Sequence, residues 1–182
     1  MAGCKMAIRV RFPMRTEFRK AILPDEIRSL MAFDRKIFPR SDLFDVTAWK
    51  TCESYWMVVD GVKVGCCAFE KHVDFREDIS EEGVNRSRKG SLYISSTGIL
   101  PKFQGQGFGA LLKSWEISYA RYYGFTRMVT NTRKQNLPII RLNRRFGFRV
   151  VRTTPRYYSG PTDSTVVMEL LLQDRRRSAR AV

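Results

Sequence analysis

"ILPKFQGQGFGALLKSWEISYA", residues 99–120, places three glycines in five positions immediately before an amphipathic run. The first four amides of a helix have no intrahelical partner and lie at the positive end of its dipole, so they attract anions. Gly105, Gly107 and Gly109 carry no side chain that would keep a phosphate away from those amides. The stretch therefore predicts a phosphate-binding loop at the start of a helix over 107–123.

Length and composition favour one globular domain. The chain has 182 residues, of which 43% are hydrophobic, enough to bury a sizeable core. We expect this domain over 1–172 and a basic tail over 173–182. The N-terminus lacks the apolar run of a signal peptide, and no window approaches the roughly 18 apolar residues of a membrane span. We therefore expect a cytoplasmic protein with no membrane partner.

The cysteines favour reduced thiols over a metal site. None of the four has the C-x-x-C spacing of a metal or redox pair, and two adjacent cysteines on a strand point to opposite faces. They are Cys4, Cys52, Cys66 and Cys67. We expect small hydrophobic thiols and no bound metal.

The net charge of +15 is concentrated around the glycine-rich stretch. Residues 100–156 carry twelve Lys and Arg against Glu116 alone, whereas residues 70–82 carry six acids against two bases. Such segregation favours an anionic ligand near the C-terminal half. Nucleic-acid binding by the same surface is an alternative that predicts a steep salt dependence, but we expect a small anionic ligand instead.

Hydrophobic periodicity and turn residues predict an α+β domain with a mixed sheet. Asp25 is the expected cap of the first helix, and Asp60-Gly61 favours a tight hairpin turn. A charged loop is expected over 74–89. In chain order we expect a strand over 6–12, helices over 25–38 and 45–52, a hairpin over 55–70, a strand over 91–100, a helix over 107–123 ended by Gly124, a strand over 125–131, a helix over 137–146 ended by Gly147, and strands over 148–154 and 164–172.

Two other phosphate-binding motifs fit the glycines less well. The spacing Gly105-x-Gly107-x-x-Ala110 meets the dinucleotide fingerprint, but Asn131 stands where an acidic ribose ligand belongs. The motif also follows about a hundred residues of hairpin-like chain instead of opening a βαβ unit. The P-loop pattern fails because Leu112 occupies the position of the glycine before its lysine.

Two segments resemble the GNAT acetyltransferase superfamily. Residues 99–109 resemble its acyl-CoA signature, an apolar strand end followed by Q-x-x-G-x-G. Asn136, followed by apolar residues and then 146–148 (Phe-Gly-Phe), resembles its next block. The resemblance implies a GNAT-type mixed, mostly antiparallel sheet flanked by helices, with acetyl-CoA as co-substrate. The acceptor would be an amine on a small molecule or a protein N-terminus. Residues 154–170 are similar to the end of the ribosomal-protein N-terminal alanine acetyltransferases.

The resemblance also implies which residues hold acetyl-CoA. Main-chain groups of residues 97–99 would face the acetyl group and the pantetheine arm, and Gly98 would let the strand leave regular pairing. Residues 104–110 would surround the pyrophosphate, and Lys102 or Arg144 would meet the outlying phosphate. The full predicted set is Thr97, Gly98, Ile99, Gln104, Gly105, Gln106, Gly107, Phe108, Gly109, Ala110, Asn136 and Asn143.

The catalytic positions depart from the closest relatives. Those relatives have a tyrosine acid where this chain has Asn143, and a glutamate base where it has Asn131. Asn143 is then expected to hold the sulfur and Asn131 to position a water. Tyr158 and its neighbour Tyr157 are the alternative acids, and His72 is expected at the surface. The missing acid and base leave open a second hypothesis, a non-catalytic acyl-CoA-binding or regulatory module.

Overall fold

The computed structural model describes residues 14–71, 90–157 and 164–172. Within these residues seven strands form one sheet in the order β1-β2-β3-β4-β5-β7-β6. Every neighbouring pair is antiparallel except β4 and β5, which are parallel. The strands are β1 (Thr16–Lys20), β2 (Glu53–Val59), β3 (Val62–Lys71), β4 (Ser91–Ile99), β5 (Arg127–Arg133), β6 (Arg149–Thr154) and β7 (Thr165–Leu171). The predicted mixed, mostly antiparallel sheet is confirmed.

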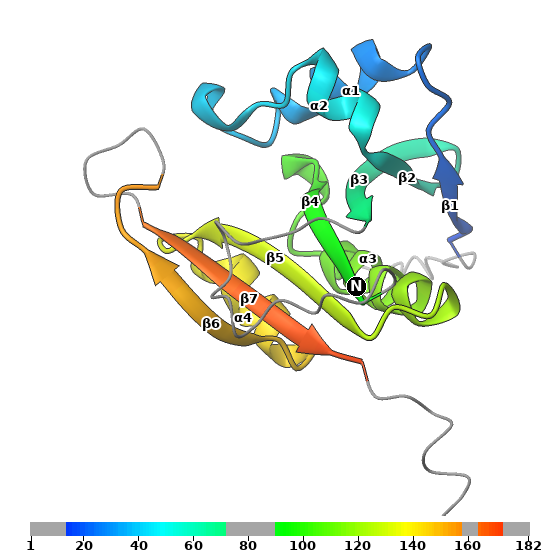
Figure 1. Ribbon diagram of the computed structural model, residues 1–182. Coiled ribbons are helices and arrows are strands. Elements are labelled where there is room, and N and C mark those ends of the chain that lie inside the picture. Colours follow the sequence, from blue (N-terminus) through cyan, green and yellow to red (C-terminus); the bar gives the residue numbers. More distant parts are fainter. Residues whose placement is uncertain (1–13, 72–89, 158–163, 173–182) are drawn as a thin grey trace, which may run out of the picture.

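The helices cover both faces of this sheet. In Figure 1, α1 and α2 lie together at the top of the view, apart from α3 and α4. The α-helices are α1 (Ile27–Asp34), α2 (Val46–Thr51), α3 (Phe108–Tyr122) and α4 (Leu137–Arg145), and two short 3₁₀ turns are η1 (Arg40–Asp42) and η3 (Pro101–Phe103). From α1 onward the helices and strands follow the predicted order, whereas β1 lies in a stretch for which no strand was predicted. The expected strand over 6–12, loop over 74–89 and tail over 173–182 lie outside the described residues.

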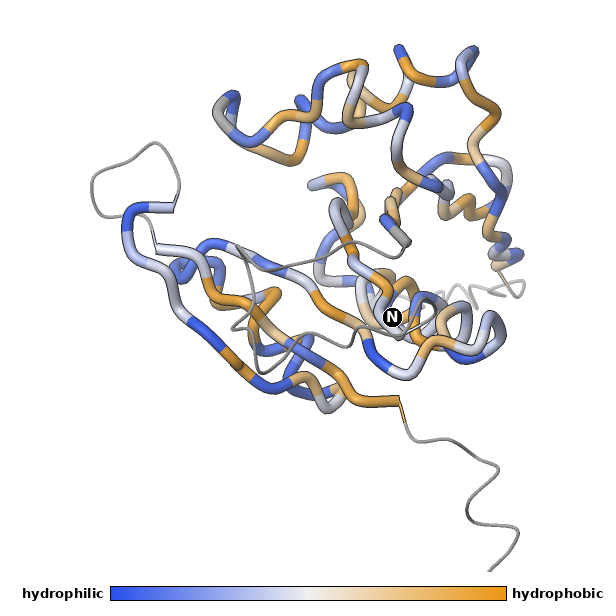
Figure 2. Tube along the Cα trace, viewed as in Figure 1, coloured by the Kyte–Doolittle hydropathy of each residue, from blue (hydrophilic) through white to orange (hydrophobic). Residues whose placement is uncertain are grey.

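Two hydrophobic cores form because β2 and β3 are buried on both faces. Alternate residues of each strand point to opposite sides, which explains their nearly continuous apolar sequences. One core packs against α3 and includes Met57, Cys67, Phe69, Leu112 and Met128. The other packs against α1 and α2 and includes Leu30, Trp49, Trp56, Cys66 and Ala68. Figure 2 shows, by contrast, that the outer strand β6 is mostly hydrophilic with one short hydrophobic stretch.

Several predicted turns and caps have the expected backbone geometry. Asp60 and Gly61 both have positive φ, 49° and 80°, as a tight hairpin turn requires. Gly124 and Gly147 follow α3 and α4 with φ of 77° and 90°, the left-handed conformation that ends many helices. Cys66 and Cys67 lie in different cores, and both thiols are buried and free.

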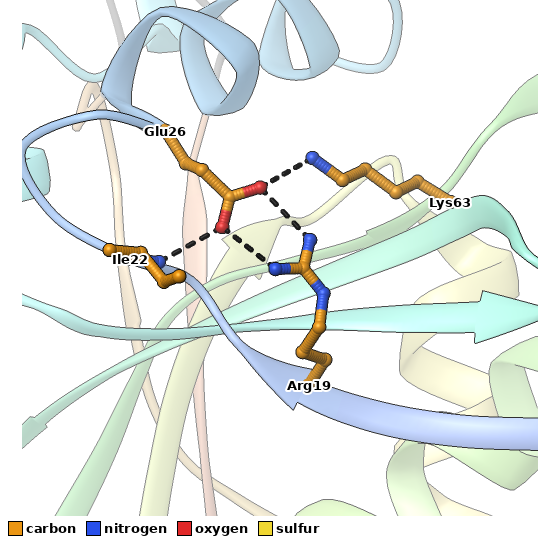
Figure 3. Close-up of polar contacts among 4 residues, drawn as sticks. All are labelled: Arg19, Ile22, Glu26 and Lys63. Atoms are coloured by element: carbon orange, nitrogen blue, oxygen red, sulfur yellow. Dashed lines mark hydrogen bonds and ion pairs between the residues drawn. The ribbon is translucent and has the colours of Figure 1, made fainter.

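The predicted cap of the first helix is wrong. The residue at the start of α1 is Glu26, not Asp25, and its side chain makes no capping hydrogen bond. Its carboxylate instead accepts hydrogen bonds from Ile22 N (2.9 Å), Arg19 (3.0 Å) and Lys63 (2.6 Å), as Figure 3 shows. Burial alone would raise the pKa of Glu26, but these bonds outweigh it and hold the pKa at about 2. Glu26 thus joins β1, α1 and β3.

No described helix combines the length and apolar character that a membrane crossing requires.

Candidate active site

The sheet opens between its two parallel strands. Pairing of β4 with β5 runs from Ser91 opposite Arg127 to Ile94 opposite Thr130 and then stops. Beyond that point β4 continues along β3 and β5 continues along β7. Figure 1 shows these two strands diverging. The last part of β4 therefore turns one backbone edge toward a gap, where its N–H and C=O groups can meet a ligand.

A bulge lies where the strands begin to part. Ala68 pairs with Ser96 and Phe69 with Ile94, so Ser95 is the extra residue on β4. The predicted departure from regular pairing at Gly98 is therefore misplaced by three residues. Gly98 pairs regularly with Cys66 and is needed for another reason. A Cβ at this position would lie 2.9 Å from Ile37 Cδ1, closer than side chains pack.

A cavity of about 1740 Å³ occupies this gap. Its walls come from the ends of β4 and β5, the glycine loop (residues 104–110), the start of α4 and the connection between α1 and α2. Most of the predicted site residues meet here. Those that line the cavity are Thr97, Gly98, Ile99, Gln104, Gly105, Gly107, Gly109, Ala110, Asn131 and Asn136.

The glycine loop has the open backbone that the sequence predicts. Gly105 and Gly107 have φ of 73° and 90°, and a Cβ on either would meet no atom within 4 Å. Glycine is thus required for conformation, and the space beside both residues is empty of protein. Gln104 Nε2 donates to Ile99 O (2.9 Å), which ties the loop to the end of β4. The loop leaves the first amides of α3 facing a site that suits an anion.

Three predicted cofactor residues have side chains that do not line the cavity. Gln106 turns its amide to Lys102 O (3.0 Å), and Phe108 is buried in the core beneath α3. Asn143 is 1% exposed, and its amide nitrogen lies 3.7 Å from Met168 Sδ. None of the three is among the residues that line the cavity.

Of the other predicted residues, two line the cavity and two lie outside the described residues. Asn136 caps α4, because its Oδ1 accepts from Ile139 N (3.5 Å). Tyr157 lines the cavity, whereas Tyr158 and His72 lie outside the described residues.

Sequence reasoning missed a polar group beside the bulge. Glu70 of β3 and Ser95 of β4 both line the cavity, and Ser95 Oγ donates to Glu70 Oε1 (2.5 Å). Cys52 Sγ lies 3.9 Å from the same oxygen, and burial above all raises the pKa of that thiol to about 11. Among the described residues no cation lies within ion-pair distance of Glu70. Glu70 and Ser95 thus place a carboxylate and a hydroxyl on the cavity wall.

A second polar pair lies on the neighbouring strands, where Tyr93 of β4 is the register partner of Glu70 and Asn131 belongs to β5. Tyr93 Oη donates to Asn131 Oδ1 (2.6 Å), and both residues line the cavity. Because Oδ1 accepts this bond, the donors of the Asn131 side chain are the N–H groups of its amide. Only the strand register brings this pair together, since the two residues are 38 positions apart.

The charged residues that line the cavity differ in their hydrogen-bond partners and in the elements that carry them. Arg133, at the end of β5, makes two hydrogen bonds to Asp42 of η1 (2.8 and 2.5 Å), which ties the α1–α2 connection across the gap. Arg141 and Arg145 also line the cavity, four residues apart on one face of α4. Lys102 and Arg144, predicted to meet the outlying phosphate, are not among the lining residues. In the part of the chain that the structure describes, no three His, Cys, Asp or Glu side chains gather as a metal site.

Proteins of known structure share this fold. The ribosomal-protein-S18-alanine N-acetyltransferase of Escherichia coli superposes with a TM-score of 0.69 at 12% identity, over 88% of this chain and 96% of that one. The NAA60 protein of Arabidopsis thaliana in complex with acetyl-CoA also gives 0.69, at 20% identity, over 86% of this chain and 98% of that one. A putative acetyltransferase from Salmonella typhimurium with its cofactor acetyl-CoA gives 0.67 at 21%, over 88% and 96%. The fold is that of acetyltransferases.

Sequence comparison gives the family. An uncharacterized N-acetyltransferase from Schizosaccharomyces pombe is 36% identical over 72 residues, which are 40% of this chain and 42% of that protein. The aligned region thus spans less than half the length of this curated relative. The model of the acetyltransferase (GNAT) family matches residues 23–148, more than half of the chain. The chain belongs to the GNAT family, as its two motifs predicted.

Proposed function

We propose that this protein transfers an acetyl group from acetyl-CoA to a primary amine of a small molecule or a polypeptide. The observation that carries the proposal is the cavity between β4 and β5, where an unpaired strand edge meets a glycine loop at a helix N-terminus. A long ligand with an anionic pyrophosphate and an amide-containing arm fits both features. Family membership and the acetyl-CoA complexes of structural neighbours support this ligand.

Each part of acetyl-CoA has a proposed binding partner. The backbone amides of residues 105–110 bind the pyrophosphate, and the edge of β4 over 97–99 pairs with the pantetheine arm. Arg141 and Arg145 meet the outlying phosphate. Asn136 stays in the proposed set because it lines the cavity at the cap of α4.

We assign Glu70 as the general base. The amine must lose a proton to attack, and a carboxylate that has no cationic partner among the described residues, at the point where the strands part, can accept it. The amine nitrogen forms a bond to the thioester carbonyl carbon, the C–S bond breaks, and the thiolate leaves with the electron pair. The proton passes to Glu70, while backbone N–H groups of β4 stabilise the oxyanion. Asn131, held by Tyr93, orients the amine or a water.

No dedicated acid is needed in this scheme. A thiolate is a tolerable leaving group in water at neutral pH, and Asn143 lies away from the cavity. Tyr157 is the described phenol on the cavity wall, and Tyr158 remains a predicted alternative.

A glycine substitution tests the proposal. Gly107→Glu directs a carboxylate into the predicted pyrophosphate site, so acetyl-CoA binding measured by calorimetry should be lost. Gly124→Glu is the matched control, because Gly124 has the same left-handed backbone and the same open surroundings at the other end of α3. Both variants should melt at similar temperatures, and only the control should bind. Wild-type affinity in folded Gly107→Glu would contradict the assignment of this site.

Turnover separates catalysis from binding alone. Asn131 and Asn143 stand where the ribosomal-protein N-terminal alanine acetyltransferases have a base and an acid, and this observation favours a non-catalytic acyl-CoA-binding module. Thiol release should be measured with a panel of amines and peptides. Release with any of them supports the transferase, whereas tight acetyl-CoA binding without release across the panel supports the module.

A further inference from the structure

Helix α3 buries an ion pair that the proposed chemistry does not use. Lys113 Nζ lies 2.5 Å from Glu116 Oε2, and the two side chains are 1% and 0% exposed. Removing two charges from water is costly, and apolar residues of similar volume often serve a core as well or better. The pair is therefore a poor candidate for a purely stabilising role.

The pair is connected to the cavity through one hydroxyl. Thr97 Oγ1 donates to Glu116 Oε1 (2.7 Å), and Thr97 lines the cavity on β4. The other Glu116 oxygen is held by Lys113, whose ammonium lies 5.5 Å from the centre of the Phe148 ring. A continuous chain of contacts thus runs from inside α3 to the strand that borders the gap.

This part of β4 needs such an anchor. Beyond Ile94 it has a strand partner on one side only, and the bulge at Ser95 interrupts the ladder on that side. The anchor residues also lie on the helix that begins at the glycine loop, Lys113 six and Glu116 nine positions after Gly107. One helix therefore carries the glycine loop at its start and the anchor of β4 further along.

We propose that Lys113 and Glu116 are positioning residues that fix the backbone of residues 97–99, through Thr97, relative to the glycine loop. The proposal rests on the proposed function, because the ligand that spans both elements is acetyl-CoA. Lys113 neutralises Glu116 and holds its carboxylate in place. Glu116 fixes the Thr97 hydroxyl and with it the orientation of the strand edge that the pantetheine arm pairs with.

The first test removes the Thr97 hydroxyl and keeps the shape of the side chain. Thr97→Val should weaken acetyl-CoA binding by about tenfold. It should also lower the melting temperature, because a buried carboxylate oxygen loses its hydrogen bond. Thr97→Ser keeps the hydroxyl and should bind more tightly than Thr97→Val. Ser118→Ala is the control, since its exposed hydroxyl bonds only within α3 to Ser114 O. Wild-type affinity in folded Thr97→Val would overturn the proposal.

The second test replaces the pair itself. Lys113→Met with Glu116→Leu keeps an apolar core of similar size and should fold, yet it should lose as much acetyl-CoA affinity as Thr97→Val. Adding Thr97→Val to this double variant should cause no further loss, because all three changes break one connection. Independent, additive losses would overturn the proposal.

A shortened ligand distinguishes positioning from general damage. Adenosine 3′,5′-bisphosphate lacks the pantetheine arm, so Thr97→Val and the double variant should bind it as the wild type does. An equal loss for this ligand would mean a structural role only and would overturn the proposal. If the wild type itself does not bind acetyl-CoA, the proposed function fails and the inference fails with it; if it binds and the variants match it, only the inference fails.

Discussion

The surroundings of the Glu70 carboxylate depend on a residue of the neighbouring strand. Glu70 follows the apolar residues of β3, near the end of that strand. The bulge at Ser95 brings a hydroxyl within 2.5 Å of its carboxylate. A regular ladder would place a different residue opposite, because a one-residue shift reverses every side chain. The bulge therefore decides that the Ser95 hydroxyl is the group that meets this carboxylate.

The first prediction concerns this carboxylate. Glu70→Gln keeps an oxygen that accepts from Ser95 but cannot take a proton, so kcat for a primary amine should fall ~10²- to 10⁴-fold. Acetyl-CoA affinity should be unchanged, because the loss concerns proton transfer only. Steady-state kinetics and calorimetry on one acceptor measure both quantities. Glu17→Gln, an exposed glutamate on β1, is the control. A kcat within about threefold of the wild type would place the base elsewhere.

At the scale of elements, the connection between α1 and α2 forms the wall opposite the glycine loop. Its N-terminal end is fixed by Asp34, a 2% exposed residue whose carboxylate accepts from Phe44 N (3.2 Å). Further along, Asp42 is bound by Arg133 from β5. Burial raises the pKa of Asp34 to about 6, although the bond from Phe44 lowers it in part. This connection is therefore sensitive to protonation.

The second prediction follows from that pKa. Between pH 3.8 and about 6 the folded protein holds a proton on Asp34 that the unfolded chain has lost, so the stability from this group declines as pH rises through 6. Asp34→Asn does not titrate and can still accept from Phe44. Its free energy of unfolding relative to wild type should increase by about 1–3 kcal/mol between pH 4 and pH 7.

Urea unfolding across this pH range measures the difference. Exposed Asp25→Asn is the matched control and should show no comparable increase. A constant difference between Asp34→Asn and wild type at all pH values would show that Asp34 is charged throughout.

At the scale of the whole molecule, the basic excess is the dominant electrostatic feature. Three of its arginines line the cavity, namely Arg133, Arg141 and Arg145, whereas others such as Arg149 are exposed on β6. Such a field raises the local concentration of an anionic ligand and is screened by salt. Some of these positive charges therefore line the cavity, and others lie on the solvated surface.

The third prediction separates these parts. Acetyl-CoA affinity should fall as salt is added, and dephospho-CoA should bind more weakly with a shallower salt dependence. Arg145→Ala should remove most of the difference between the two ligands, whereas Arg149→Ala should preserve it. Calorimetry at several salt concentrations gives the slopes. Equal affinities and slopes for both ligands in the wild type would argue against arginines at the outlying phosphate.

Much of the fold could be predicted because its signals are local. The Asp60-Gly61 turn and the ends of α3 at Gly124 and α4 at Gly147 each depend on residues within a few positions of one another. The predicted cap of α1 was wrong because the contact that decides it is not local. Glu26, at the start of α1, accepts hydrogen bonds from Arg19 and from Lys63, and Lys63 is 37 residues away. No local sequence pattern indicates that contact.

The sequence by itself determined the family, the order of the elements and the glycine loop at the start of α3, because periodicity, glycines and motif spacing act over short stretches of chain. Only the tertiary structure decided which side chains meet in the gap. The separation of β4 from β5 opens the cavity, and the bulge brings Ser95 to the Glu70 carboxylate. Packing of α4 against β7 buries Asn143 beside Met168. These outcomes depend on strand register and on packing between residues far apart in the chain, which sequence spacing does not encode.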